Sequence, residues 1–109
     1  MANHKVIPTP PEKRTQEYWP LLNNIIDPEI GIGIVDLGLI YNIEIKKDTM
    51  VITITLTSMG CPFGASIVEQ IKDEMEKLPK IKKVNVDIVW DPIWTVDRIN
   101  PDIRSVLPL

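Results

Sequence analysis

One stretch, from Thr53 to Phe63, constrains the fold more than any other part of the chain. It begins with isoleucine and leucine alternating with threonine, which is the pattern of a half-buried β-strand. It then reaches Pro62, and proline suits the first position of a helix, where its missing N–H costs nothing. Gly60 permits a sharp turn between the two. The stretch therefore predicts a strand, a turn and a helix in succession, with Cys61 at the helix N-terminus.

Cys61, the only cysteine of the chain, admits two interpretations. At a helix N-terminus, the unpaired N–H groups and the positive end of the helix dipole favour the thiolate, which attacks electrophiles and binds metals. Alternatively, the thiol is a small buried hydrophobe, as free cysteines often are. The position of the residue leaves both interpretations open.

Composition excludes several classes of function. A chain of 109 residues makes one domain, and its net charge of −3 argues against a nucleic-acid-binding surface. A single cysteine excludes an internal disulfide. No apolar run approaches the roughly 18 residues of a membrane span. Residues 1–13 also lack the apolar core of a secretion signal. We therefore expect a cytosolic protein that binds neither nucleic acid nor membranes.

Hydrophobic periodicity predicts the main elements in the order helix, strand, strand, helix, strand. The helices are expected at 17–26 and 62–78, and the strands at 39–46, 50–57 and 84–90. Between them, 27–38 is a long glycine-rich loop, and long ordered loops tend to be functional. Asn100 is a candidate N-cap for a final short helix. The proline-rich residues 1–14 predict a flexible tail, and residues 15–109 a single domain.

This order predicts a two-layer α+β sandwich with a small sheet and both main helices on one of its faces. The expected apolar strand positions are Leu39, Tyr41, Ile43, Ile45, Ile52, Ile54, Leu56, Val84, Val86 and Ile88. The expected apolar stripe of the second helix is Phe63, Ile67, Val68, Ile71, Met75 and Leu78. Thr53, Thr55 and Thr57 are expected on the open face of the sheet.

A thiol enzyme would need a base beside Cys61. The only histidine is His4, in the predicted tail, so we do not expect an enzyme. Asp27 and Glu29 stand near the start of the long loop and gain interest only if that loop folds back toward Cys61. Trp90 and Trp94 surround Asp91-Pro92, and they are either core residues or the wall of a pocket or partner surface.

Four motifs stand in the chain in a characteristic order. They are Asp27-Pro28-Glu29-Ile30-Gly31, Asp36-Leu37-Gly38-Leu39-Ile40-Tyr41, Thr57-Ser58-Met59-Gly60-Cys61-Pro62 and Trp90-Asp91-Pro92-Ile93-Trp94-Thr95. In order and spacing, from about residue 15 to 104, they resemble the metal–sulfur (iron–sulfur) cluster assembly family. That family includes PaaD-like and SufT-like proteins and the cytosolic iron–sulfur assembly factor of eukaryotes.

The resemblance implies the small α/β fold of that family and a role in the maturation of iron–sulfur proteins. It also implies a site that contains Cys61 as the reactive or metal-binding thiol. The other residues of the implied site are Asp27, Glu29, Thr57, Ser58 and Gly60. Many relatives have threonine in place of Ser58 and proline in place of Met59.

An iron–sulfur cluster normally needs about four protein ligands, mostly thiolates. One cysteine per chain cannot hold a cluster alone, although a homodimer would offer two thiolates. Carboxylate oxygens are harder and weaker ligands for this purpose. We therefore expect transient binding of a cluster or of iron through Cys61, in exchange with scaffold or carrier proteins and client apoproteins. A docking adaptor of the same machinery, with no metal of its own, is the alternative.

Overall fold

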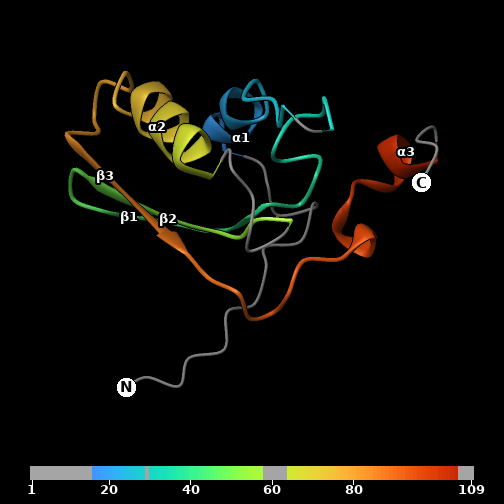
Figure 1. Ribbon diagram of the computed structural model, residues 1–109. Coiled ribbons are helices and arrows are strands. Elements are labelled where there is room, and N and C mark those ends of the chain that lie inside the picture. The colour runs from blue at the N-terminus through green and yellow to red at the C-terminus, as the bar shows by residue number, and fades with distance from the viewer. Residues whose placement is uncertain (1–15, 29, 58–63, 106–109) are drawn as a thin grey trace.

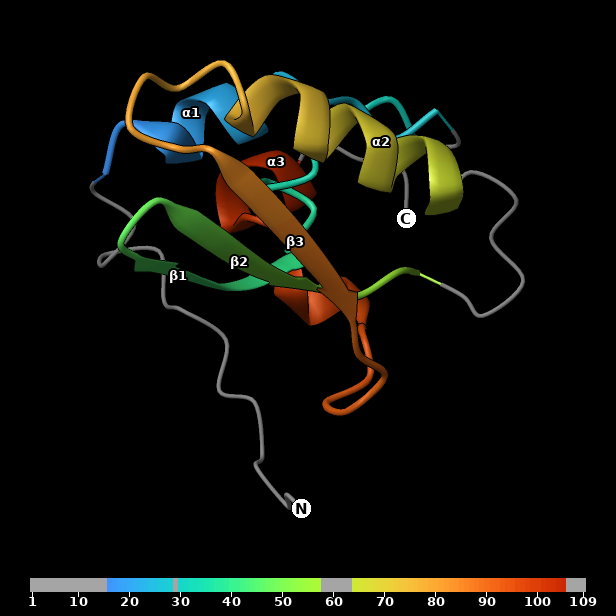
Figure 2. The same cartoon turned by 90° about the vertical axis from the view of Figure 1, so that its left-hand side faces the viewer.

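The computed structural model of the chain describes residues 16–28, 30–57 and 64–105. The predicted tail, residues 1–14, lies outside the described residues. The elements, in chain order, are α1 (Tyr18–Leu22), β1 (Ile40–Lys46), β2 (Thr49–Ile54), α2 (Gly64–Met75), β3 (Lys83–Ile88), a 3₁₀ helix η2 (Val96–Arg98) and α3 (Pro101–Arg104). Figures 1 and 2 both show α1 and α2 over the same face of the sheet. The predicted two-layer α+β architecture is therefore confirmed.

The sheet has the strand order β1-β2-β3, with β2 in the middle. β1 and β2 form an antiparallel hairpin closed by Lys47 and Asp48, and Lys47 has a positive φ of 58°. β2 and β3 are parallel, with Ile54 opposite Ile88. Parallel neighbours need a crossover connection, and α2 lies in the connection between these two strands. The need for a crossover explains why the next element after β2 is a helix, as the sequence pattern predicted.

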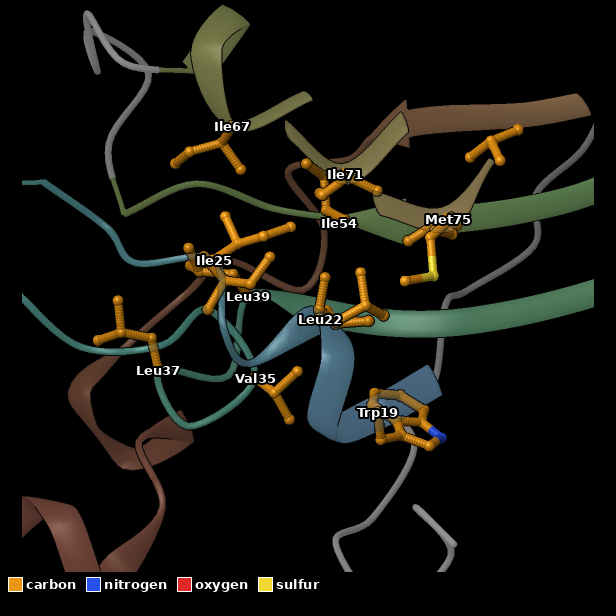
Figure 3. Close-up of a cluster of buried hydrophobic side chains, with 14 of the residues drawn as sticks. Trp19, Leu22, Ile25, Val35, Leu37, Leu39, Ile54, Ile67, Ile71 and Met75 are labelled. Atoms are coloured by element: carbon orange, nitrogen blue, oxygen red, sulfur yellow. The ribbon is translucent and has the colours of Figure 1, made fainter. Parts of the chain in front are cut away.

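A single apolar core lies between the helices and the sheet. The residues from β2 and α2 that form its centre are at most 1% exposed and recur at the strand and helix periods: Met50, Ile52, Ile54, Ile67, Ile71 and Met75. α1 adds Trp19 and Leu22. Figure 3 shows side chains from both helices and from β2 gathered in this space. Burial of each large apolar side chain contributes about 1.5–3 kcal/mol, so this core is the main source of stability.

Both main helices are shorter than predicted. α1 ends at Leu22 rather than at residue 26, because the Asn23 side chain turns away to bond the backbone and carboxylate of Asp36. Ile26 then forms a β-bridge with Gly33. α2 ends at Met75, three residues before the predicted end. The predicted helix start at residue 62 lies outside the described residues.

The first strand departs from simple alternation at Tyr41. Ile40 pairs with Ile54 and Asn42 pairs with Thr53, so Tyr41 is the extra residue of a β-bulge. Tyr41 is wholly buried, as its apolar strand position predicts. The bulge, however, places Ile40 rather than Tyr41 in the row that packs in the main core cluster.

Three burial predictions are wrong. Ile45, expected in the apolar row of β1, is 46% exposed. Thr55, expected on the open face, is wholly buried beside Tyr41, because the chain after β3 returns to this end of the sheet. Ile88, expected in the core, is 40% exposed, because it is the last residue of an edge strand. Leu56, which was expected in the core, is 6% exposed and belongs to it.

The chain beyond β3 contains two short helices, η2 and α3. Asn100 is the N-cap of α3, and its side-chain oxygen accepts a hydrogen bond from the Asp102 N–H at 3.0 Å. Pro101 occupies the first turn, where a missing N–H costs nothing. The predicted final helix is therefore confirmed. Figure 1 shows α3 beyond the end of the sheet where β2 finishes, on the same side as the loop of residues 30–38.

Candidate functional site

Several of the predicted site residues lie outside the described part of the chain: Glu29, Ser58, Gly60 and Cys61. The described chain stops at Thr57, just after β2, and resumes at Gly64, the first residue of α2. Both ends are anchored. A Cβ atom added to Gly64 would lie 2.8 Å from Cδ1 of Leu56, so the start of α2 packs closely against the end of the β2 segment. The residues between Thr57 and Gly64 therefore join two fixed points.

Asp27 begins a tight turn, which we call the 27–31 turn. Its side chain is 2% exposed, and its Oδ1 accepts a hydrogen bond from the Ile30 N–H at 3.2 Å. Its carbonyl oxygen accepts a bond from the Gly31 N–H at 2.7 Å, and Gly31 has a positive φ of 80°. Its own N–H donates to the Ile32 carbonyl at 3.0 Å. The Asp27 carboxylate is thus held at a fixed place by the backbone of its own turn.

Asp36, in the same loop, bonds to distant segments instead. Its Oδ2 accepts a hydrogen bond from the Asn23 side-chain amide at 2.9 Å, and its Oδ1 accepts one from the Asn100 amide at 3.1 Å. The Asp36 carbonyl oxygen also accepts from the Asn100 N–H at 2.7 Å. Asp36 therefore joins the end of α1 to the start of α3. The motif containing Asp36 was visible in the sequence, but this role was not predicted.

Leu37 and Gly38, which follow Asp36, contact the segment that contains Trp94 and Arg98. The indole Nε1–H of Trp94 donates to the Leu37 carbonyl at 2.7 Å. A Cβ atom on Gly38 would overlap the Arg98 carbonyl oxygen, and Gly38 has a positive φ of 79°. Only glycine lets the two backbones approach so closely at this point.

Tyr41 completes this set of contacts. Its hydroxyl donates to the Pro92 carbonyl at 2.8 Å, and the Arg98 guanidinium lies 5.3 Å from the centre of its ring. Burial raises the pKa of Tyr41, and the positive charge of Arg98 opposes that rise. The Asp91–Pro92 peptide bond is cis. We call the whole set the C-terminal clasp, and its members are Asn23, Asp36, Leu37, Gly38, Tyr41, Pro92, Trp94, Arg98 and Asn100.

The C-terminal clasp determines which side chains are exposed in the segment 90–94, the predicted partner surface. Trp90 and Trp94 are half-buried and pack against the core, whereas Asp91 is exposed. Between them, Ile93 is 70% exposed, more than any other large apolar residue described. Its two neighbours are both hydrogen-bonded: the Pro92 carbonyl accepts from Tyr41 of β1, and the Trp94 indole donates to Leu37 in the loop before β1. The sequence drew attention to the tryptophans, but the side chain that faces solvent is Ile93.

Within residues 16–28, 30–57 and 64–105, no three histidine, cysteine, aspartate or glutamate side chains are grouped to hold a metal. The Asp27 carboxylate bonds to its own turn, and the Asp36 carboxylate bonds to two amides. The donor set in this part of the chain therefore does not fit a resident metal. In the same part of the chain, no helix is long and apolar enough to cross a bilayer.

Comparison with known proteins identifies relatives of the chain. A sequence model described as "Iron-sulfur cluster assembly protein" matches residues 16–88. The Fe-S protein maturation auxiliary factor YitW of Bacillus subtilis is 45% identical over 80 residues, which are 72% of this chain and 78% of that one. The Fe-S protein maturation auxiliary factor SufT of Staphylococcus aureus is 44% identical over 77 residues, which are 70% of this chain and 88% of that one.

The fold also matches a solved structure. A domain of unknown function, DUF59, from Bacillus anthracis superposes with a TM-score of 0.75 at 34% sequence identity. The match covers 81% of this chain and 84% of that one, so it includes most of the sheet-and-helix architecture described above.

Proposed function

Because the chain belongs to the iron–sulfur cluster assembly protein family, and so to the auxiliary factors of iron–sulfur protein maturation, we propose that it delivers clusters or iron through Cys61. The cluster is cargo in this proposal, not a resident cofactor. The chain receives it from a scaffold or carrier protein and passes it to a client apoprotein. We place this exchange in the cytosol, where thiols are kept reduced. The role is delivery rather than catalysis.

One observation supports Cys61 as the exchanging ligand. The segment that contains it joins Thr57 to Gly64, and the packing of Gly64 on Leu56 fixes the first turn of α2 at the end of the strand. Cys61 stands three positions before Gly64, the first residue of a helix of 12 residues. We propose that its thiol is close enough to feel the positive end of the helix dipole. That position favours the thiolate, which is the form that binds iron.

The number of ligands explains why the binding must be transient. One thiolate per chain leaves about three positions of a cluster to be filled by a partner. A cluster held in that way leaves when the partner exchanges, as delivery requires. We propose that Asp27, Glu29, Thr57, Ser58 and Gly60 surround the thiol and tune it. The anchored Asp27 carboxylate is the described member of this group with the lowest exposure.

A second candidate function is a docking adaptor without iron of its own. The exposure of Ile93 favours it, because an apolar side chain on a hydrogen-bonded turn is already ordered before a partner binds. In that case the turn of residues 90–94, with Trp90, Asp91 and Trp94 behind Ile93, makes the partner contact.

The two candidates differ in what happens to iron. We predict that the protein, incubated anaerobically with iron, sulfide and a loaded scaffold protein, takes up cluster absorbance and transfers it to an apo-acceptor. Cys61→Ser should abolish both uptake and transfer, because a hydroxyl is nearly isosteric with a thiol but is a much weaker ligand for iron. Far-UV circular dichroism and thermal unfolding should be unchanged. The measurements are visible absorbance and iron per chain.

Asp27→Asn provides a matched comparison. The asparagine side-chain oxygen can accept the same bond from the Ile30 N–H, so the turn is kept while the negative charge is removed. Altered transfer with unaltered unfolding would place the carboxylate in the site. Wild-type protein that takes up no iron, alone or with a scaffold, would contradict the delivery proposal and leave the adaptor.

A further inference from the structure

The outer edge of β1 is the basis of an inference that does not depend on the proposed function. Among the described residues, β1 pairs with β2 alone. Lys46 and Thr49 face each other beside the two-residue turn and form the first hydrogen-bonded pair of the hairpin. Along a strand, the backbone N–H and C=O groups of successive residues point alternately to one side and the other. Since those of Lys46 point toward β2, those of Ile45 and Ile43 point away from β2. The edge therefore offers backbone groups to another strand.

Only the second half of this edge is accessible. Ile40 and Tyr41 are at most 1% exposed, and Tyr41 is bonded to the C-terminal clasp. From Glu44 to Lys46 the strand is exposed, and Ile45 is 46% exposed although it was expected in the apolar row. A docking strand must therefore lie over the end of β1 nearest the β1–β2 turn.

An apolar hollow adjoins that end of the strand. Its volume is about 530 Å³, and the apolar residues that line it are Tyr18, Ile45, Leu78, Pro79 and Ile81. Ile45 pairs with the buried Met50, so it lies on the side of the sheet that faces the helices. A strand added at this edge would thus place its own side chains over the hollow.

Charge selects a second copy of this chain as the occupant. Within one copy the exposed Glu44 and Lys46 side chains already lie 3.9 Å apart. If two β1 strands pair antiparallel about Ile45, Glu44 of each copy also lies opposite Lys46 of the other. Cross-strand pairs of opposite charge are stabilising, and both pairs form at once by symmetry. Displacement of one strand by two residues, which centres the pairing on Glu44, would place Glu44 opposite Glu44 and is disfavoured. The sequence Glu44-Ile45-Lys46 is therefore complementary to itself in one register.

We propose that the chain forms a symmetric dimer in which two β1 strands pair antiparallel about Ile45 and join two sheets into one. The two Ile45 residues form a hydrogen-bonded pair and lie between the two apolar hollows. The helical layers lie on the same side of the joined sheet. Each copy has the end of β2 at the far end of the joined sheet. With about 3.4 Å per strand residue, the two Thr57 residues are more than about 30 Å apart.

The separation has a consequence for the cysteine. Two Cys61 thiols, each a few residues from a Thr57, cannot meet on one cluster within such a dimer. Each copy presents its own thiol to a separate partner. This dimer therefore differs from one that would bridge a cluster between two Cys61 residues.

Sedimentation equilibrium of the full chain tests the proposal. Wild type should show a monomer–dimer equilibrium. Glu44→Lys and Lys46→Glu should each raise the dimer dissociation constant about tenfold or more, because each variant places like charges opposite one another twice. An equimolar mixture of the two variants should restore dimerisation, because positions 44 and 46 then carry opposite charges in both cross-strand pairs.

The matched control is Asp87→Lys, the same change of charge on the exposed face of the other edge strand, β3. It should leave the dimer unchanged, and circular dichroism should show all variants folded. A monomeric wild type would overturn the proposal and leave the edge to a strand of another protein or to the N-terminal residues of this chain. Single variants that dimerise as wild type does, or a mixture that stays monomeric, would overturn it too.

Discussion

Two turns of the same long loop each contain a glycine with positive φ, yet they are held in different ways. The 27–31 turn, with Gly31, is closed by bonds from Asp27 to residues within five positions in sequence. The turn at Gly38 belongs to the C-terminal clasp, in which the Asp36–Asn100 bond joins residues 64 positions apart. The clasp joins segments that are distant in sequence, whereas the bonds given above for the 27–31 turn are local.

Replacement of each glycine by alanine should give the largest separation between the two turns. Both residues have nearly the same φ, 79° for Gly38 and 80° for Gly31. A Cβ on Gly38 would overlap the Arg98 backbone, whereas a Cβ on Gly31 would have no described atom within 4 Å. We predict that Gly38→Ala lowers the free energy of unfolding by about 3 kcal/mol or more. Gly31→Ala should cost only the backbone strain, about 1 kcal/mol.

Urea denaturation of the two variants measures this difference. Equal losses would show that the clasp does not depend on close backbone approach at Gly38. The comparison with Gly31→Ala removes the shared cost of an alanine at positive φ, so the remaining difference reports the contact with Arg98.

The parts of the fold that were predicted correctly depend on local patterns. The alternation of Ile52 and Ile54 and the stripe of Ile67 and Ile71 depend only on the strand and helix periods. The N-cap at Asn100 is also local, because its acceptor and donor lie two positions apart. Such features follow from backbone geometry and do not need knowledge of the tertiary partners.

The features that were missed are set by distant partners. The hydrogen bond of Tyr41 to Pro92 and the burial of Thr55 beside Tyr41 depend on the chain after β3, which returns to the end of β2. The early end of α1 depends on Asp36, 13 positions from Asn23. Of the site residues, the structure places Asp27 and Thr57, whereas Cys61 lies outside the described residues and keeps the role proposed from its position and family.

The hydrogen bond of Tyr41 gives a prediction with a pH dependence. Tyr41→Phe removes the bond to the Pro92 carbonyl and should cost about 1 kcal/mol at neutral pH. Burial raises the pKa of Tyr41 in the folded state above the ordinary value of 10.0. A raised pKa contributes stability that is complete below the unfolded value and is lost as pH rises through the folded value. Wild type should therefore lose this contribution above pH 10, whereas the variant has none to lose.

The measurement is urea denaturation of both proteins from about pH 8 to about pH 11. The difference in free energy of unfolding should shrink as pH rises, because ionised Tyr41 can no longer donate to Pro92. Tyr18, whose pKa burial also raises, is present in both proteins and cancels in the difference. A difference that is constant with pH would mean that Tyr41 ionises as easily in the folded protein as in the unfolded chain.

Substitution of Ile93 should have the smallest effect on the free energy of unfolding. It also tests whether the C-terminal clasp presents Ile93 to a binding partner. Its side chain is 70% exposed, so Ile93→Ser should change the free energy of unfolding by less than about 0.5 kcal/mol. If the clasp presents Ile93 to a partner, the same variant should weaken binding to a loaded scaffold protein, measured by calorimetry, by about tenfold. Val96→Ser, at a neighbouring residue that is 39% exposed, is the control and should bind as wild type does. If Ile93→Ser binds the scaffold protein as tightly as wild type does, the clasp only stabilises the fold. The exposure of Ile93 would then no longer favour the adaptor function.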